Sequence, residues 1–284
     1  MGRLYRTLIV IGLTFGIAHT GDCQTYRVDW CSVNSGAGLT SNGSHSLNCS
    51  LGQSSAGLVT DSNHLHWVGF WGGEVPDPLA VPGIGSVKLL ADGSYVSLTG
   101  KIATSSLVDF DSFFYLEEAD RSSGVRVAVP GLPVGGLMRG SVVNVIGTLG
   151  TTDAGERQLM GPVVIIVSSH EPIEPLGMGN RWVGGNSLGT LPAGQMGTTG
   201  GYGLNNVGLL IQTWGSVTEV GAGYVLIDDG ANLPVRLQTS VLSAPPPLGD
   251  YVSTIGISSL HWSGTERLRL LLPRDDQDVI RRAP

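Results

Sequence analysis

The chain has 284 residues, 43 of them glycine, and a formal net charge of −7. Apolar residues make up 41% of it, which suffices for packed cores and argues against global disorder. Only 14% of the residues are charged, and the chain lacks the overall basic excess that a polyanion-binding surface normally needs. The composition predicts tight turns, packed strands and a sparsely charged surface.

Residues 1–23 are predicted to be an export signal. The basic segment Met1–Arg6 is followed by the apolar segment Thr7–Ala18, which is too short to span a bilayer of about 30 Å. We place cleavage before Gln24, although a site two or three residues earlier fits nearly as well. The protein is therefore expected to be secreted or held at the cell surface, with no transmembrane segment in the mature chain.

Residues 24–75 are expected to form a small β module with short aromatic strands at 26–30, 47–53 and 64–71. A module of this size buries too little surface to be stable by itself. Cys31 and Cys49 would remain after cleavage, and a disulfide between them would add about 2–4 kcal/mol in an oxidising compartment. The alternative is two free, buried thiols.

Three short motifs follow one another in this module: Gly52-Gln53, Ala56-Gly57 and Gly69-Phe70-Trp71. The segment resembles a small module at the N-termini of exported bacterial proteins, in which a Gly-Gln and Ala-Gly stretch precedes a Gly-Phe-Trp ending. The resemblance covers about fifty residues. It implies export and a surface or extracellular location, and it implies no activity.

After a stiff, proline-rich linker at 76–85, the chain repeats itself. Residues 140–147 recur as 249–256, and residues 125–127 recur as 235–237. The order of these and other matches is kept, which indicates two copies of one β-domain. We place the copies at 86–168 and 208–275, followed by a C-terminal tail at 276–284.

Each copy is expected to contain five short strands, because apolar alternation is interrupted every eight to twelve residues by turn-forming residues. An early glycine, Gly100 or Gly215, would let the long first strand bend through both layers of a small barrel. The first copy's expected strands are 95–102, 112–119, 125–129, 141–149 and 163–167. The second copy's are 209–217, 224–228, 235–238, 251–258 and 266–272.

The fold class predicted is therefore all-β: two tandem OB-like five-stranded barrels preceded by a small N-terminal β module. Immunoglobulin-like sandwiches are the alternative. The patterns Val-x-Leu-x-Gly-x-Ile at 96–102, Phe-Tyr-Leu-Glu-Glu at 114–118 and Gly-x-Val-Val-x-Val-x-Gly at 140–147 resemble bacterial OB-fold domains of the nucleic-acid-binding type. The resemblance covers about half of the chain and implies fold more than function.

The connector at 169–207 is glycine-rich, yet it also contains Met178, Trp182, Leu188 and Tyr202. A flexible linker usually lacks such side chains, so we expect an ordered clamp that packs on both barrels. The alternative is simple disorder.

No catalytic constellation is found in the sequence, so the protein is expected not to be an enzyme and to need no cofactor or metal. Carboxylates cluster at 109–120 and again at Asp228-Asp229, where they could hold Ca²⁺. Their spacing does not match the calcium loop of an EF-hand, and aspartates are common in hairpin turns. Whether these clusters bind calcium stays open.

Arg126 and Arg236 occupy the same place in the two copies, and alternation puts both on the outside, where OB-folds bind ligands. The alternative is that Arg126 pairs with Glu117 and Arg236 with Asp228. The aromatic residues that could offer stacking surfaces nearby are Phe113, Tyr115, Trp214 and Tyr224.

The leading functional hypothesis is an exported, non-catalytic structural or adhesive protein of the surface or matrix. Its partners would be copies of itself or other matrix components, because open strand edges allow self-association, for example into a filament. The alternative hypothesis is ligand binding by the OB-like barrels, with single-stranded nucleic acid or oligosaccharide as the ligand.

Overall fold

The computed structural model describes residues 36–41, 46–51, 57–60, 65–68, 77–131, 134–190 and 192–282. The chain divides into two units, Met1–Val75 and Pro76–Pro284. The predicted signal peptide and Cys31 lie outside the described residues, so export and the disulfide remain predictions. No helix among the described residues is long and apolar enough to cross a membrane.

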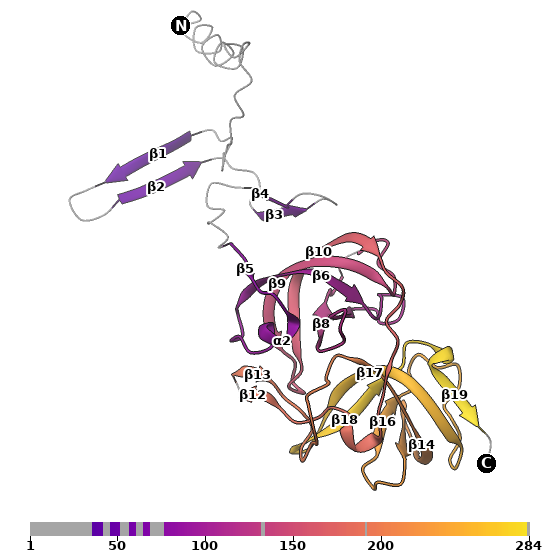
Figure 1. Cartoon of the computed structure of the whole chain (residues 1–284). Helices are drawn as coiled ribbons and strands as arrows, with labels where there is room; N and C mark the ends of the chain where they lie inside the picture. Colours follow the sequence, from indigo (N-terminus) through magenta and orange to yellow (C-terminus); the bar gives the residue numbers. More distant parts are fainter. Residues whose placement is uncertain are drawn as a thin grey trace, which may run out of the picture. The chain divides into compact units, whose positions relative to one another are not determined.

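The first unit contains two antiparallel strand pairs (Figure 1). Strand β1 (Gly36–Ser41) pairs with β2 (Ser46–Leu51), and β3 (Gly57–Thr60) pairs with β4 (Leu65–Val68). Strands β2 and β4 overlap expected strands, whereas β1 lies in a stretch whose glycines favour turns. The pairing of β1 with β2 outweighs that local preference.

Five strands of the second unit close into a barrel, here called barrel 1. They are β6 (Tyr95–Ala103), β7 (Phe113–Glu117), β8 (Gly124–Ala128), β9 (Ser141–Thr151) and β10 (Arg157–Ser169). The order is β6-β7-β8-β10-β9, β9 pairs back to β6, and β8 runs parallel to β10. This is an OB-fold-like barrel. Strand β5 (Leu79–Ala80) extends its edge, and the short helix α2 (Ile84–Val87) follows.

A second sheet follows, and its strands also pair in a ring. They are β14 (Leu210–Gly221), β15 (Tyr224–Asp228), β16 (Val235–Gln238), β17 (Tyr251–Ser263) and β18 (Glu266–Leu272). Their order is β14-β15-β16-β18-β17, and β17 pairs back to β14. Strands β11 (Leu176–Gly177) and β19 (Val279–Arg282) lie at the edges.

The expected strands overlap observed ones in both sheets, and the main differences are in length. Strand β10 begins at Arg157 rather than at 163, because its first residues pair with the end of β9. Strand β17 continues to Ser263 rather than ending at 258, because Trp262 pairs with Arg267 of β18. Hairpin pairing with the neighbouring strand therefore extends strands past the point where the alternation pattern weakens.

The two early glycines serve different purposes. Gly100 has a φ of +66°, and the β6–β9 register shifts between Leu98 and Lys101, so it makes the predicted bend. At Gly215 the backbone of Asp228 comes so close that a Cβ would lie 2.6 Å from its carbonyl carbon. Gly215 therefore permits close packing of two strands.

Side-chain alternation separates each sheet into an inner and an outer face. In β7, Phe114 and Leu116 point into the core of barrel 1, and Phe113, Tyr115 and Glu117 lie on the other face. The cores of both sheets are mostly aliphatic. That of barrel 1 includes Val96, Leu98, Val125, Val127, Val143 and Val145, and that of the second sheet includes Ile211, Val225, Ile227, Val235, Leu237 and Leu271.

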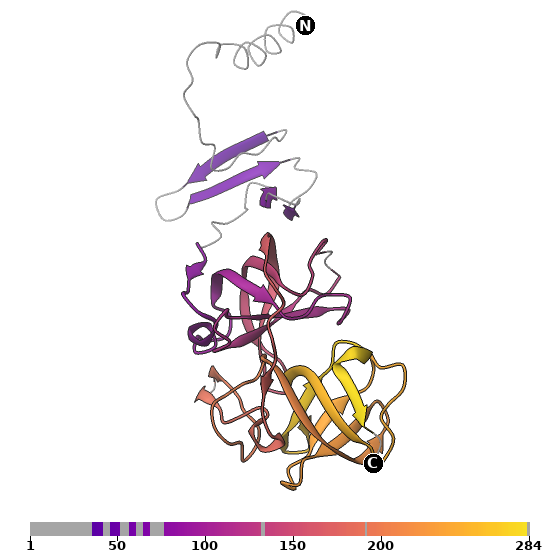
Figure 2. The ribbon, with the colours of Figure 1, turned by 45° about the vertical axis from the view of Figure 1, so that its right-hand side comes forward.

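The connector contains β11, the 3₁₀ helix η1 (Asn180–Trp182), β12 (Leu188–Thr190) and β13 (Ala193–Gln195). It lies beside both sheets (Figure 2). Val183 belongs to the core of the second sheet, and the Gln195 amide oxygen accepts a hydrogen bond of 2.9 Å from the backbone N–H of Arg157 in barrel 1. The connector thus touches both sheets.

Candidate ligand-binding groove

A groove of about 500 Å³ runs where the outer face of barrel 1 meets the second sheet. One wall comes from β7, β8 and the turn between β9 and β10, and the other from β17 and β18. Barrel 1 contributes Phe113, Arg126, Thr151, Thr152, Asp153, Ala154, Glu156 and Gln158, and the second sheet contributes Ser259, Leu260, Leu270 and Leu272. The strands that carry ligand contacts in OB-folds, the second and third, thus form one wall.

Arg126 is held in this groove by an aromatic ring. Its guanidinium carbon lies 3.7 Å from the centre of the Phe113 ring. Phe113 in turn stacks on Phe110, with ring centres 4.8 Å apart and planes 15° apart. Since the two partners cannot share one face of the ring, Phe113 lies between them. Among the described residues, Arg126 forms no ion pair, with Glu117 or any other residue, and its Nε has no hydrogen-bond partner.

The second sheet repeats the arrangement. The Arg236 guanidinium carbon lies 3.5 Å from the centre of the Tyr224 ring, and the Tyr224 hydroxyl donates to Glu219 at 2.6 Å. Within the described part of the chain Arg236 has no ion pair either, so the expected alternative pairing with Asp228 is not formed. Arg236 pairs in register with Leu270, which lines the groove, so this second arginine lies beside it.

Of the predicted site residues, two sets come together: Arg126 with Phe113 and Tyr115, and Arg236 with Tyr224. Tyr115 is fully buried and packs with Leu210 and Ile257 of the second sheet, so it joins the two sheets. Trp214 is 38% exposed on β14 and does not line the groove. The rings of Phe113 and Tyr224 contact arginines, so the guanidinium groups are the planar surfaces available to a ligand.

Glu117, Glu156 and Lys88 are ionisable side chains buried at the junction. Burial raises the pKa of Glu117 to about 8, although the backbone N–H of Leu210 donates to its carboxylate and opposes the rise. Burial also raises the pKa of Glu156, whose two oxygens accept hydrogen bonds from Tyr115 at 2.9 Å and Ser259 at 2.8 Å. Burial lowers the pKa of Lys88 to about 8, and its ammonium donates to the carbonyl of Val207 at 2.6 Å.

The carboxylates considered for calcium are mostly engaged with protein groups. Asp109 pairs with Arg139 at 2.7 Å, and Glu118 pairs with Lys101 at 2.7 Å. In the part of the chain that the structure describes, no group of three or more histidine, cysteine, aspartate or glutamate side chains is arranged to hold a metal ion.

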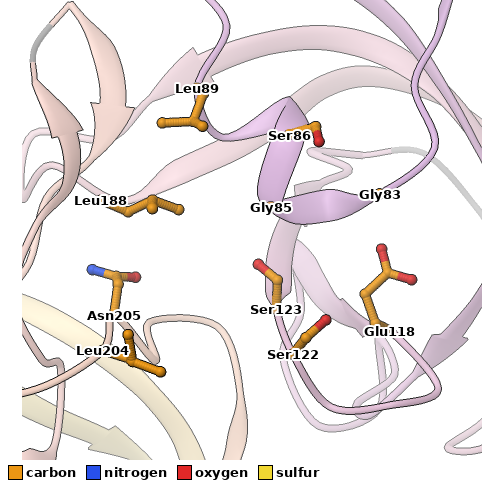
Figure 3. A pocket seen from close by; sticks show the side chains of 10 residues that line it. All are labelled: Gly83, Gly85, Ser86, Leu89, Glu118, Ser122, Ser123, Leu188, Leu204 and Asn205. Atoms are coloured by element: carbon orange, nitrogen blue, oxygen red, sulfur yellow. The ribbon is translucent and has the colours of Figure 1, made fainter.

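A second cavity, of about 450 Å³, lies between helix α2, the β7–β8 turn and the connector (Figure 3). Ser122 and Ser123 lie on one side of it and Leu188 and Leu204 on the other. The carboxylate of Glu118 at its edge already accepts hydrogen bonds from Ile84 and Lys101. Its lining offers no arginine, so it has less to attract an anion than the groove.

The sequence did not single out Phe110, Glu156 or Gln158 as part of the site. One signal could have found Glu156, because Gly155-Glu156-Arg157 recurs as Gly264-Thr265-Glu266-Arg267. That match marks the hairpin between the last two strands of each copy, and in barrel 1 this hairpin lines the groove. Phe110 precedes β7 in a turn, where no periodicity indicates the direction of its side chain.

No known family and no curated protein matches the chain. Among solved structures, it is similar to a murine DNA-binding protein bound to double-stranded DNA, with 11% identity and a TM-score of 0.31 over 67% of this chain and 97% of that one. It is also similar to a multidomain protein with nucleic-acid-binding domains from Streptococcus pneumoniae, with 15% identity and a TM-score of 0.17 over 62% of this chain and 45% of that one. These likenesses are too low to carry a functional argument.

Proposed function

We propose that the protein is a non-catalytic, single-strand nucleic-acid-binding protein built from two tandem OB-like domains, with the groove as its main contact surface. The observation that carries the proposal is the repeated arginine–aromatic pair, Arg126 with Phe113 and Arg236 with Tyr224. Stacking on a ring fixes a guanidinium group in position, so less conformational entropy is lost when the arginine binds a ligand.

The chemistry of a fixed arginine suits a single strand. Its outer face can stack on a base, and its N–H groups can donate to a phosphate. Both arginines lack a carboxylate partner among the described residues, so an incoming phosphate would not have to displace one. The net charge of −7 limits the contribution of long-range attraction, and we therefore expect weak, salt-sensitive binding.

Oligosaccharide is the second candidate, favoured by the mixed lining of the groove. Thr152 offers a hydroxyl group, and Gln158 and Asp153 offer acceptors beside Arg126. Sugars need donors and acceptors together, whereas a phosphate needs donors only. A neutral sugar would bind with little dependence on salt, which separates the two candidates.

The test is a fluorescence-anisotropy titration of the full chain with labelled oligo-dT at several salt concentrations. With an oligonucleotide short enough to occupy the groove alone, two phosphate contacts on a single strand predict a slope of log K against log salt of about −1.4. Arg126→Gln and Arg236→Gln should each weaken binding and flatten the slope by about 0.7. Arg281→Gln, which removes an exposed arginine from edge strand β19, should change neither.

The absence of any oligo-dT binding at low salt would overturn the nucleic-acid proposal. Salt-independent binding of a neutral oligosaccharide that Arg126→Gln weakens would favour the second candidate. The expected structural or filament role draws no support from the described residues or from the comparisons, and it stays a prediction that light scattering at high protein concentration would test.

A further inference from the structure

A second group of arginines and aromatic rings, which includes neither Arg126 nor Arg236, lies on the second sheet and the connector. It is called here the arginine cluster, and its members come from the connector, β17 and β18. They are Arg181, Trp182, Tyr202, Trp262, Arg267 and Arg269.

Within the cluster each exposed ring lies close to a guanidinium group. The Arg181 guanidinium carbon lies 4.6 Å from the centre of the Tyr202 ring, and Tyr202 packs edge-on against Trp182 at 6.4 Å. The Arg267 guanidinium carbon lies 4.8 Å from the centre of the Trp262 ring. The three rings, although large and apolar, are 42–46% exposed.

The connector and β18 are tied together here, so the cluster is a fixed arrangement. The backbone N–H of Thr199 donates to the Arg267 carbonyl at 2.9 Å, and the Arg267 N–H donates to the Thr199 hydroxyl at 3.0 Å. The guanidinium of Arg269 donates to the Arg181 carbonyl at 3.4 Å.

The charge of the cluster is unbalanced. None of its three arginines forms an ion pair with another described residue. Arg269 is only 7% exposed, and its Nε, like that of Arg267, is buried without a hydrogen-bond partner in the described part of the chain. Guanidinium groups without a carboxylate partner favour an anionic ligand.

The cluster begins where the groove ends. A Cβ on Gly155 would lie 2.9 Å from the Nε of Arg267, and the neighbours of Gly155, Ala154 and Glu156, line the groove. A ligand that leaves the groove past this hairpin therefore reaches Arg267.

We propose that the arginine cluster is a second contact site for the same single strand, at which Arg181 and Arg267 bind backbone phosphates and an exposed tryptophan stacks a base. This inference rests on the proposed function and extends it: a long strand contacts both the groove and the cluster, and a short one occupies the groove alone. Exposed aromatic rings beside arginines are the usual platform for single strands.

The test compares the full chain with the variants Arg181→Gln and Arg267→Gln, using oligo-dT of roughly 5 and roughly 15 nucleotides, lengths near the two ends of the range of site sizes for an OB-fold. Each variant should bind the longer oligonucleotide about tenfold more weakly, as expected for one lost charge-assisted hydrogen bond, and should bind the short one like the parent. Arg281→Gln is the matched control for an exposed arginine on the same sheet, and thermal melting checks that Arg267→Gln folds.

The outcomes separate the two proposals. If Arg126→Gln weakens binding while Arg181→Gln and Arg267→Gln bind both lengths like the parent, the groove stands and the cluster does not. If these two variants weaken short and long oligonucleotides equally, the length-dependent contact is overturned. If the parent binds neither length, the proposed function fails together with this inference.

Discussion

The hydroxyl of Tyr115 donates a hydrogen bond of 2.9 Å to Glu156, and both side chains are buried where barrel 1 meets the second sheet. The other oxygen of Glu156 accepts from Ser259 of β17. One carboxyl group therefore bridges the outer face of barrel 1 and the second sheet. This bridge, together with the packing of Tyr115 on Leu210 and Ile257, joins barrel 1 to the second sheet beside the groove.

Replacing Tyr115 with phenylalanine should destabilise the second unit. The ring would still pack, but a buried oxygen of Glu156 would lose its donor, which costs about 1–3 kcal/mol. Urea denaturation followed by tryptophan fluorescence would measure the loss. Tyr95→Phe, on β6 and partly exposed, is the matched control and should change stability by less than about 0.5 kcal/mol. Equal effects of the two variants would contradict the bridging role.

The buried carboxyl of Glu117 should make stability depend on pH. Its pKa is raised to about 8 by burial, whereas in the unfolded chain it is about 4.3. Between these values the folded state holds the proton and the unfolded state does not. The stabilisation that this group contributes is therefore fully present below about pH 4.3 and is lost as pH rises through 8. Each pH unit changes the free energy of unfolding by no more than about 1.4 kcal/mol.

Glu117→Gln should therefore make the fall in stability between about pH 4.3 and 8 shallower, since an amide cannot lose a proton. Part of the fall should remain, because burial raises the pKa of Glu156 in the same direction. Denaturant midpoints measured at a series of pH values would show both the shallower fall and the part of it that remains. Glu171→Gln, at an exposed position, is the control and should leave the profile of the parent unchanged.

Local patterns in the sequence were sufficient to place strands but not to place the site. Alternation located β15 and β16 at their observed bounds, and it placed Arg126 and Arg236 outside the cores. The same alternation could not show that Tyr115 faces Ile257, because that contact depends on how barrel 1 meets the second sheet. How two sheets pack against each other depends on side chains far apart in the sequence, so no local periodicity predicts it.

The role of the aromatic residues also could not be predicted from the sequence. Phe113 and Tyr224 were expected as stacking surfaces for a ligand, and in the structure an arginine lies over each ring. The residue types indicated the right neighbourhood, since both pairs occupy the outer face. Which planar group meets the ligand follows only from the rotamers, and these depend on neighbours such as Phe110.

Gly208 should tolerate no side chain. Its φ is +90°, and a Cβ there would lie 2.6 Å from the carbonyl oxygen of Gly124, where the connector meets β8. Gly208→Ala should therefore cost about 2–3 kcal/mol through backbone strain and the displaced contact. Gly135→Ala, at an exposed site with nothing within 4 Å of its Cβ, is the control and should be nearly neutral. Thermal unfolding of both variants would decide, and equal melting temperatures would refute the close contact.

Phe113 should matter to ligand binding although its ring is covered on both faces. Without the ring, Arg126 would regain rotamer freedom, and ordering it on a ligand would cost about 1 kcal/mol, or roughly fivefold in affinity. Phe113→Ala should therefore weaken oligo-dT binding while the charge of Arg126, and with it the salt slope, is retained. Phe113→Tyr should bind like the parent, because tyrosine holds the arginine at the equivalent position of the second sheet. If Phe113→Tyr were as weak as Phe113→Ala, positioning of Arg126 by an aromatic ring would not explain the effect.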